Sequence, residues 1–226
     1  CQIPWNETSL NLLDNPGTPS FQAEAKQAAH VADAALWVFN AGVGVKTELE
    51  KVWEYAAARS LPSLLFISAL DKEGTSWEKV VEEIEKALEI KTVPLSIPIG
   101  KNAALEGVVD LVSGEAFRYT ADGSGKRQKI EIPAAMSGEV EAARKKLMED
   151  AAEADDQLLE KYLGDGTLTA AEILKGLKAG VMSRGLFPVL CGSGGKNVGA
   201  TELLNAIVSV LPSPVESAKA CPVQAL

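Results

Sequence analysis

Short apolar runs alternate with amphipathic segments along the first hundred residues. This alternation predicts strands over Ser9–Asp14, Ala34–Asn40, Ser63–Ser68 and Val93–Gly100, and helices over Phe21–Ala32, Thr47–Ser60 and Trp77–Leu88. The last helix has the clearest apolar stripe, formed by Trp77, Val81, Ile84 and Leu88, and a capping box is expected at Thr75–Glu78. Strands and helices in this order predict an α/β fold with a doubly wound, mostly parallel sheet covered by helices on both faces.

The pattern changes after Gly100. The next segment predicts short antiparallel strands around a glycine-rich hairpin near Asp122–Gly125, and we expect the basic stretch Gly125–Lys129 to be a solvated tip. Helices are then expected over Glu139–Leu163 and Thr169–Lys178, with a capping box at Thr169–Glu172, before a strand at Leu186–Ser193 and a helix at Ala200–Leu211. We therefore expect an α/β domain made of residues 1–102 and 186–214, an α+β insert at 103–185 and a linker at 215–226.

Composition and charge narrow the possible partners. The net charge of −9 and the pI of about 4.8 give no general attraction to nucleic acid or to an anionic membrane surface. The three cysteines show neither metal-ligand spacing nor a disulfide framework, which suits a cytoplasmic protein. The longest apolar run, near Leu61–Ala69, is too short to cross a bilayer, so no membrane partner is expected.

Three predicted strand ends carry loops that suggest a binding site. They contain Asp14–Gly17, Asp71 and Ser193–Gly195. The carboxyl ends of parallel strands lie on one edge of a sheet, so these loops are expected to meet at one crevice. Each loop alone also has an ordinary structural explanation as a turn or a helix cap.

The order and separation of these motifs resemble the GTP-binding domain of translational GTPases, in particular bacterial elongation factor G and its divergent paralogues. The similar stretches run through nearly the whole chain and read NLLDNPG, EKVWEYA, IPIG, LEGVVDLV, LLEKYL, FPVLCGS and KNVGATELLNAIVSVLPSP. The resemblance implies a fold of the P-loop GTPase type. It also implies that the insert corresponds to the extra subdomain of elongation factor G, and that a β-barrel domain would follow.

The resemblance also implies roles for individual residues and the ligands GTP or GDP and Mg²⁺. Asp14 would reach the magnesium ion through water, and the backbone N–H of Gly17 would contact the γ-phosphate. Asp71 would accept two N–H bonds from the guanine edge, and backbone N–H groups of Ser193 and Gly194 would bind the guanine carbonyl. Asp71 would then select guanine, because adenine cannot donate the same two hydrogen bonds.

Several positions depart from the family pattern. Thr18 follows Gly17 where the family has a histidine that positions the attacking water, which implies slow or differently triggered hydrolysis. Ser68 and Ala69 replace an asparagine and a lysine of the guanine motif. Two lost contacts of ~1 kcal/mol each would weaken binding roughly 30-fold.

The first strand of the family fold, its phosphate loop and the first switch segment are absent, and we expect truncation to be the reason. In the family that strand lies between those matching Ser9–Asp14 and Ala34–Asn40, so a gap in the sheet is expected. The chain alone should then bind guanine nucleotide only weakly.

The leading hypothesis is a partial GTP-binding domain of an elongation-factor-G-like translational GTPase, with hydrolysis coupled to ribosomal translocation. Contacts with ribosomal RNA would come mainly from other domains, and residues 103–185 would be the place to contact a ribosomal stalk protein. The alternative is a ribosome-associated guanine-nucleotide-binding module, or a ribosomal-protection factor, with little or no hydrolysis. Thr18, Ser68 and Ala69 favour that alternative.

Overall fold

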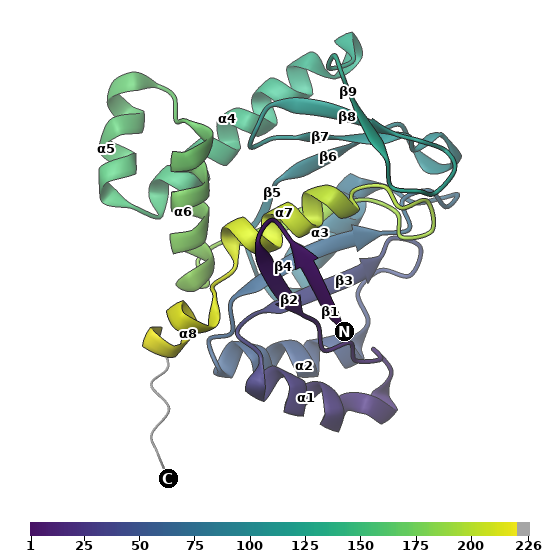
Figure 1. Cartoon of the computed structure of the whole chain (residues 1–226), viewed down its shortest axis with the longest axis vertical. Helices are drawn as coiled ribbons and strands as arrows, with labels where there is room; N and C mark the ends of the chain where they lie inside the picture. The colour runs from purple at the N-terminus through teal and green to yellow at the C-terminus, as the bar shows by residue number, and fades with distance from the viewer. Residues whose placement is uncertain (221–226) are drawn as a thin grey trace.

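A parallel sheet and an antiparallel sheet, each of four strands, organise the chain (Figure 1). The computed structural model describes residues 1–220. The strands are β1 Gln2–Trp5, β2 Thr8–Asn11, β3 Ala35–Asn40, β4 Ser63–Ser68, β5 Thr92–Pro94, β6 Ser96–Ile99, β7 Gly107–Asp110, β8 Glu115–Tyr119, β9 Arg127–Ile130 and β10 Phe187–Cys191. The α-helices are α1 Gln22–Val31, α2 Thr47–Ala58, α3 Trp77–Leu88, α4 Ser137–Glu153, α5 Asp156–Asp165, α6 Ala170–Met182, α7 Ala200–Val210 and α8 Pro214–Ala220.

The parallel sheet has the strand order β3-β4-β10-β5 and is covered on both faces. Side chains of β4 alternate between the faces, as a pleated strand requires. Leu64 and Phe66 belong to one buried cluster with residues of α4, α6 and α7, whereas Leu65 and Ile67 belong to a second cluster with residues of α2 and α3. The predicted α/β class and doubly wound arrangement are confirmed.

The antiparallel sheet has the order β6-β7-β8-β9 and lies above the parallel sheet in Figure 1. The expected single strand Val93–Gly100 is wrong, because β5 belongs to the parallel sheet and β6 to the antiparallel one. Leu95, between β5 and β6, forms backbone hydrogen bonds on both sides of this change of sheet. Its N–H donates to the Val189 carbonyl at 2.9 Å, and its own carbonyl accepts from the Leu111 N–H at 2.9 Å.

The N-terminal segment differs from the prediction. The expected strand Ser9–Asp14 is not part of the parallel sheet, because β2 pairs antiparallel with β1 around a turn at Asn6 and Glu7. Both turn residues have positive φ, 45° and 61°, as in the two-residue turns that match strand twist. Within residues 1–220, β3 pairs only with β4, so its other edge carries no strand.

Two helix predictions also need correction. The expected helix Glu139–Leu163 is divided into α4 and α5, because the Asp155 carboxylate caps a new helix by accepting from the N–H groups of Gln157 and Leu158, both at 3.1 Å. The capping box at Thr169–Glu172 is confirmed.

At α3 the cap is Ser76 rather than Thr75. The Ser76 hydroxyl accepts from Lys79 N–H at 3.4 Å, while Thr75 Oγ1 donates to the Lys72 carbonyl at 2.8 Å. Val80, rather than the expected Val81, is the buried valine of this helix. The described helices include none that is both long and apolar enough to cross a membrane.

The division into residues 1–102 with 186–214, 103–185 and 215–226 stays a prediction. Helix α8 occupies the beginning of the expected linker, and residues 221–226 lie outside the described residues.

Candidate functional site

Two loops follow adjacent parallel strands at one edge of the sheet. The first loop, Ala69–Ser76, leaves β4, and the second loop, Gly192–Gly199, leaves β10. Ser193 Oγ donates to Asp71 Oδ1 at 2.6 Å, and the Gly194 N–H donates to Ser68 Oγ at 3.2 Å. The structure therefore brings together Ser68, Ala69, Asp71, Ser193 and Gly194, and their role in binding a base stays a prediction.

The Asp71 side chain is mostly buried, and its carboxyl group is held in the ionised form. Its side chain is only 10% exposed, and Lys72 Nζ lies 3.4 Å from Oδ2. Burial raises the pKa of Asp71, but the Ser193 hydroxyl, the backbone N–H of Asp71 and the Lys72 charge outweigh it and lower the pKa below 3.8. Oδ1 thus has a strong donor, while Oδ2 has only a long ion pair with an exposed lysine.

The first loop turns through a strained residue. Ala69 has a φ of 62°, in the left-handed region that costs a residue with a Cβ about 1–2 kcal/mol. This turn lets Leu70 return to the core, where it is 4% exposed, while Asp71 stays at the rim. The Lys72 N–H closes the turn on the Ala69 carbonyl at 3.1 Å.

The second loop is closed by its own backbone. Ser193 is completely buried, and Ser193 and Val198 exchange N–H to carbonyl bonds at 3.0 Å each. Ser193 Oγ also accepts from the Lys196 N–H at 3.2 Å, so one hydroxyl orders both its own loop and Asp71. A Cβ on Gly192 would lie 2.2 Å from the Val198 carbonyl oxygen, so this position requires glycine.

Sequence reasoning missed two residues of the second loop that bind connections between strands of the antiparallel sheet. Lys196 Nζ donates to the Ala103 carbonyl at 2.7 Å, and Asn197 Nδ2 donates to the Gly123 carbonyl at 3.4 Å. No motif marks these residues, because their partners are backbone carbonyls distant in sequence.

The expectation that Gly125–Lys129 is a solvated tip is wrong for Arg127. Arg127 Nη1 donates to the carboxylate of Glu202 on α7, and the two side chains are 25% and 3% exposed. Tyr119 Oη also donates to Glu202. Burial, followed by the Glu202 charge, raises the pKa of Tyr119, which therefore remains a donor.

The remaining predicted site residues lie apart from this cluster. Asp14 and Gly17 are exposed between β2 and α1, and no heavy atom lies within 4 Å of where a Gly17 Cβ would be. Thr18 precedes the 3₁₀ turn Pro19–Phe21, and its hydroxyl makes no capping hydrogen bond. Among the described residues, no hydrogen bond or ion pair connects Asp14, Gly17 or Thr18 to either loop.

The described residues do not by themselves form a magnesium site. Asp14 offers one exposed carboxylate, and residues 1–220 contain no group of three or more His, Cys, Asp or Glu able to hold a metal ion. A divalent cation needs several oxygen ligands, so the water-mediated role expected for Asp14 stays a prediction.

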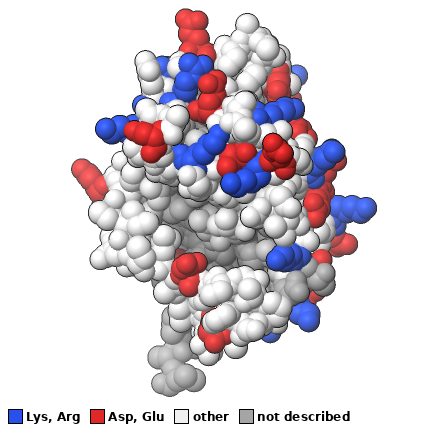
Figure 2. Space-filling view, turned by 90° about the vertical axis from the view of Figure 1, so that its right-hand side faces the viewer, with Lys and Arg blue, Asp and Glu red and all other residues white. Residues whose placement is uncertain are grey.

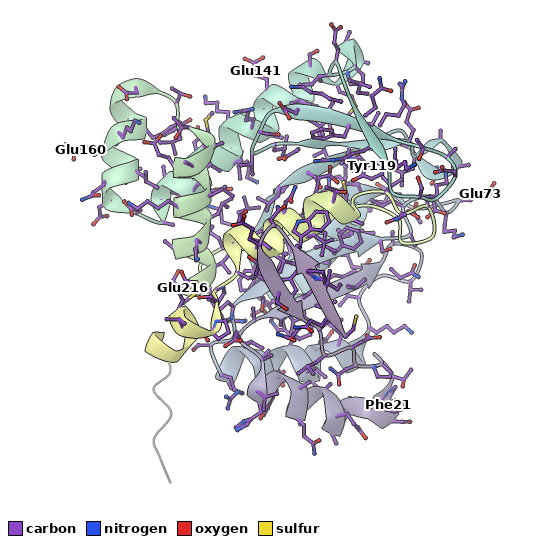
Figure 3. All side chains as sticks on the ribbon, in the orientation of Figure 1. Phe21, Glu73, Tyr119, Glu141, Glu160 and Glu216 are labelled. Atoms are coloured by element: carbon purple, nitrogen blue, oxygen red, sulfur yellow. The ribbon has the colours of Figure 1, made fainter. Side chains whose placement is uncertain are left out.

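The molecular face that carries the first loop is hollowed and poor in charge at its centre. Figure 3 labels Glu73 at the right-hand edge, and Figure 2 shows that face directly, with charged side chains mainly above and to the right of the hollow.

The doubly wound sheet and the two loops define an α/β domain of the GTPase class, and comparisons with known proteins agree. The sequence profile of the family described as Elongation factor Tu GTP binding domain matches residues 1–213. The chain therefore belongs to the elongation factor Tu GTP-binding domain family.

Within this family the chain is similar to elongation factor G. It is 36% identical over 214 residues to elongation factor G of Mycoplasma pneumoniae, covering 95% of this chain and 31% of that protein. A crystal structure from Thermus thermophilus aligns with a TM-score of 0.86 at 30% identity, covering 95% of this chain and 32% of that chain. The chain thus spans about a third of the length of these relatives.

Proposed function

We propose that the two loops bind the guanine base of GTP and GDP, with the Asp71 carboxylate accepting the N1 and 2-amino hydrogens. The observation that carries this proposal is the 2.6 Å bond from Ser193, which holds an ionised, mostly buried carboxylate at the edge of the sheet. A carboxylate has about four lone-pair positions, so Asp71 can keep this bond and still accept two more.

Base selection follows from the donors on the purine edge. Each bond to the carboxylate is charge-assisted and contributes about 1.5–3 kcal/mol, and adenine presents neither donor at these positions. In the same site, the Ser193 N–H already donates to the Val198 carbonyl and the Gly194 N–H to Ser68 Oγ, so each would have to exchange that partner to bind the guanine carbonyl. Asp71 is therefore the selecting residue, and the expected contact of the second loop with the guanine carbonyl requires the loop to rearrange.

The wider role extends beyond this chain. We infer that it serves a cytoplasmic translational GTPase in which hydrolysis is coupled to translocation on the ribosome, with RNA contacts from other parts of the protein. A stalk-protein contact is proposed for residues 103–185. When bound, Mg²⁺ would neutralise phosphate charge, with Asp14 reaching it through water and Gly17 contacting the γ-phosphate.

A second candidate is a guanine-nucleotide-binding module or ribosomal-protection factor with little hydrolysis. Thr18 favours it, because this residue is exposed, lacks an imidazole and forms no capping bond that would fix its hydroxyl. Ribosome-stimulated phosphate release by the full-length protein separates the two candidates, since a binding module should show no stimulation.

The variant Asp71→Asn tests base recognition. The asparagine oxygen can still accept the N1 hydrogen, but its amide group would oppose the 2-amino group of guanine and would pair with the 2-oxo group of xanthine. In the full-length protein we expect GDP affinity to fall about 100-fold and xanthosine diphosphate to become the better ligand.

The matched control is Glu73→Gln, an exposed carboxylate in the same loop, which should leave both affinities unchanged. Isothermal titration with the diphosphates of guanosine, xanthosine and adenosine measures the result. An Asp71→Asn protein that still prefers GDP over both other nucleotides would refute the proposed role.

A further inference from the structure

The β8–β9 hairpin contacts the second loop and the helix that follows it. Asn197 Nδ2 donates to the Gly123 carbonyl at 3.4 Å in the turn of the hairpin. A Cβ on Gly125 would lie 2.5 Å from that amide nitrogen, so the hairpin turn and the loop are packed closely. The second loop therefore lies between the first loop on one side and this hairpin on the other.

A buried carboxylate anchors the other end of the loop. Glu202 lies in the first turn of α7, directly after the loop, and its side chain is 3% exposed. It accepts from Arg127 at the start of β9 and from Tyr119 at the end of β8. A carboxylate so deeply buried is stable only with such donors, which means that its position is fixed by the hairpin.

The loop has little freedom to absorb a shift of α7. Gly199 joins the loop to the helix with a φ of 83°, and a Cβ there would lie 2.4 Å from the Cys191 carbonyl oxygen. Movement of Glu202 would therefore be transmitted to the backbone pair of Ser193 and Val198, and through Ser193 Oγ to Asp71.

We propose that Glu202, held by Arg127 and Tyr119, is a positioning residue for the guanine-base loop, so that the β8–β9 hairpin sets how firmly the base is retained. This inference rests on the proposed function. Glu202 and its partners touch no part of the base; they act by keeping the backbone of the second loop and the Ser193–Asp71 bond in place.

The test compares Arg127→Met with Arg118→Met in the full-length protein. Arg118 is a matched control on the same hairpin, because its ion pair is with Glu106, at 3.1 Å on the exposed side, and it has no hydrogen bond or ion pair with the described residues of α7. Tyr119→Phe removes only the hydroxyl that binds Glu202 and serves if Arg127→Met does not fold. Amide hydrogen exchange of Ser193 and Val198 without nucleotide, and the dissociation rate of a fluorescent GDP analogue, are measured for each variant.

We expect Arg127→Met to speed both amide exchange in the loop and GDP release about tenfold, the change that ~1.4 kcal/mol produces, with a smaller effect for Tyr119→Phe and none for Arg118→Met. Unchanged exchange in both Arg127→Met and Tyr119→Phe would overturn the positioning role, whatever the GDP release rates are.

Faster exchange with unchanged GDP release, in a protein that prefers GDP over ADP, would overturn the link to base retention. A parent protein with no preference for GDP would refute the proposed function, and with it the assignment to base retention. The exchange data alone would then decide whether Glu202 orders the loop.

Discussion

The bond from Ser193 to Asp71 makes a prediction that does not depend on any nucleotide. The substitution Ser193→Ala removes a 2.6 Å hydrogen bond to a carboxylate and the acceptor of the Lys196 N–H at 3.2 Å. The Asp71 carboxylate and the Lys196 N–H both face the Ser193 hydroxyl, and Ser193 is completely buried, so water replaces the lost partner poorly. We expect the free energy of unfolding at neutral pH to fall by about 2–3 kcal/mol.

The pH dependence of this loss has a defined sign. The pKa of Asp71 in the folded chain lies below its ordinary value of 3.8, so its contribution to stability is present above 3.8 and is lost as the pH falls through the lower, folded-state value. Once Asp71 is protonated, Ser193 contributes only a neutral hydrogen bond of ~1 kcal/mol. The penalty of Ser193→Ala should therefore shrink by about 1 kcal/mol under acid conditions.

Urea unfolding of the parent and variant chains at neutral pH and well below pH 3.8 measures this change. Ser68→Ala is the control, because Ser68 Oγ accepts only the neutral Gly194 N–H, at 3.2 Å, and its penalty should not change with pH. Carbon-13 NMR of the Asp71 carboxyl group should show a higher pKa in Ser193→Ala. An equal penalty at both pH values, with the Asp71 titration unmoved, would refute the reasoning.

Two further predictions concern backbone geometry. In urea unfolding, the free energy of unfolding of Gly194→Ala should be within about 0.5 kcal/mol of that of the parent, because the new Cβ would lie at an ordinary 3.7 Å from Ser68 Oγ. That of Gly192→Ala should fall by ~2 kcal/mol or more, because its Cβ would clash with the Val198 carbonyl oxygen. Equal stabilities of the two variants would contradict this account. Thr169→Ala removes a complete capping box and should lower the free energy of unfolding by ~1 kcal/mol, and a variant as stable as the parent would contradict that.

The parallel sheet could be predicted from sequence because its signals are local. The run Ser63–Ser68 is apolar on both faces, as expected for a strand covered by helices on each side. The amphipathic pattern of Trp77–Leu88 likewise gave the bounds of α3. In these segments the pattern of apolar residues alone indicates which side chains are buried.

Other features depend on partners that the local pattern does not contain. The strand signal near Ser9 is real, but β2 is paired by Gln2–Trp5 rather than by the parallel sheet. Glu202 resembles any polar residue in the first turn of a helix, and its burial depends on Arg127, which is 75 positions away.

The break before α5 had a local signal, since consecutive aspartates at Asp155 and Asp156 favour a helix start.

The site residues divide in the same way. Family resemblance placed Asp71, Ser193 and Gly194 together because the loops follow strands whose pairing is strongly specified. It gave no information on how Thr18 would be oriented, since the segment between β2 and the 3₁₀ turn forms neither helix nor strand and the Thr18 hydroxyl makes no capping hydrogen bond.

The two unusual residues of the guanine motif affect affinity more than base choice in the proposed site. Ser68 lacks an amide, yet its hydroxyl still connects the loops by accepting the Gly194 N–H. Ala69 lacks the lysine stem, yet it adopts the left-handed turn, at a φ of 62°, that delivers Asp71 to the rim. Since the carboxylate and its Ser193 donor are both retained, we expect the loss of the asparagine and lysine side chains to weaken binding while the proposed selection of guanine by Asp71 is kept.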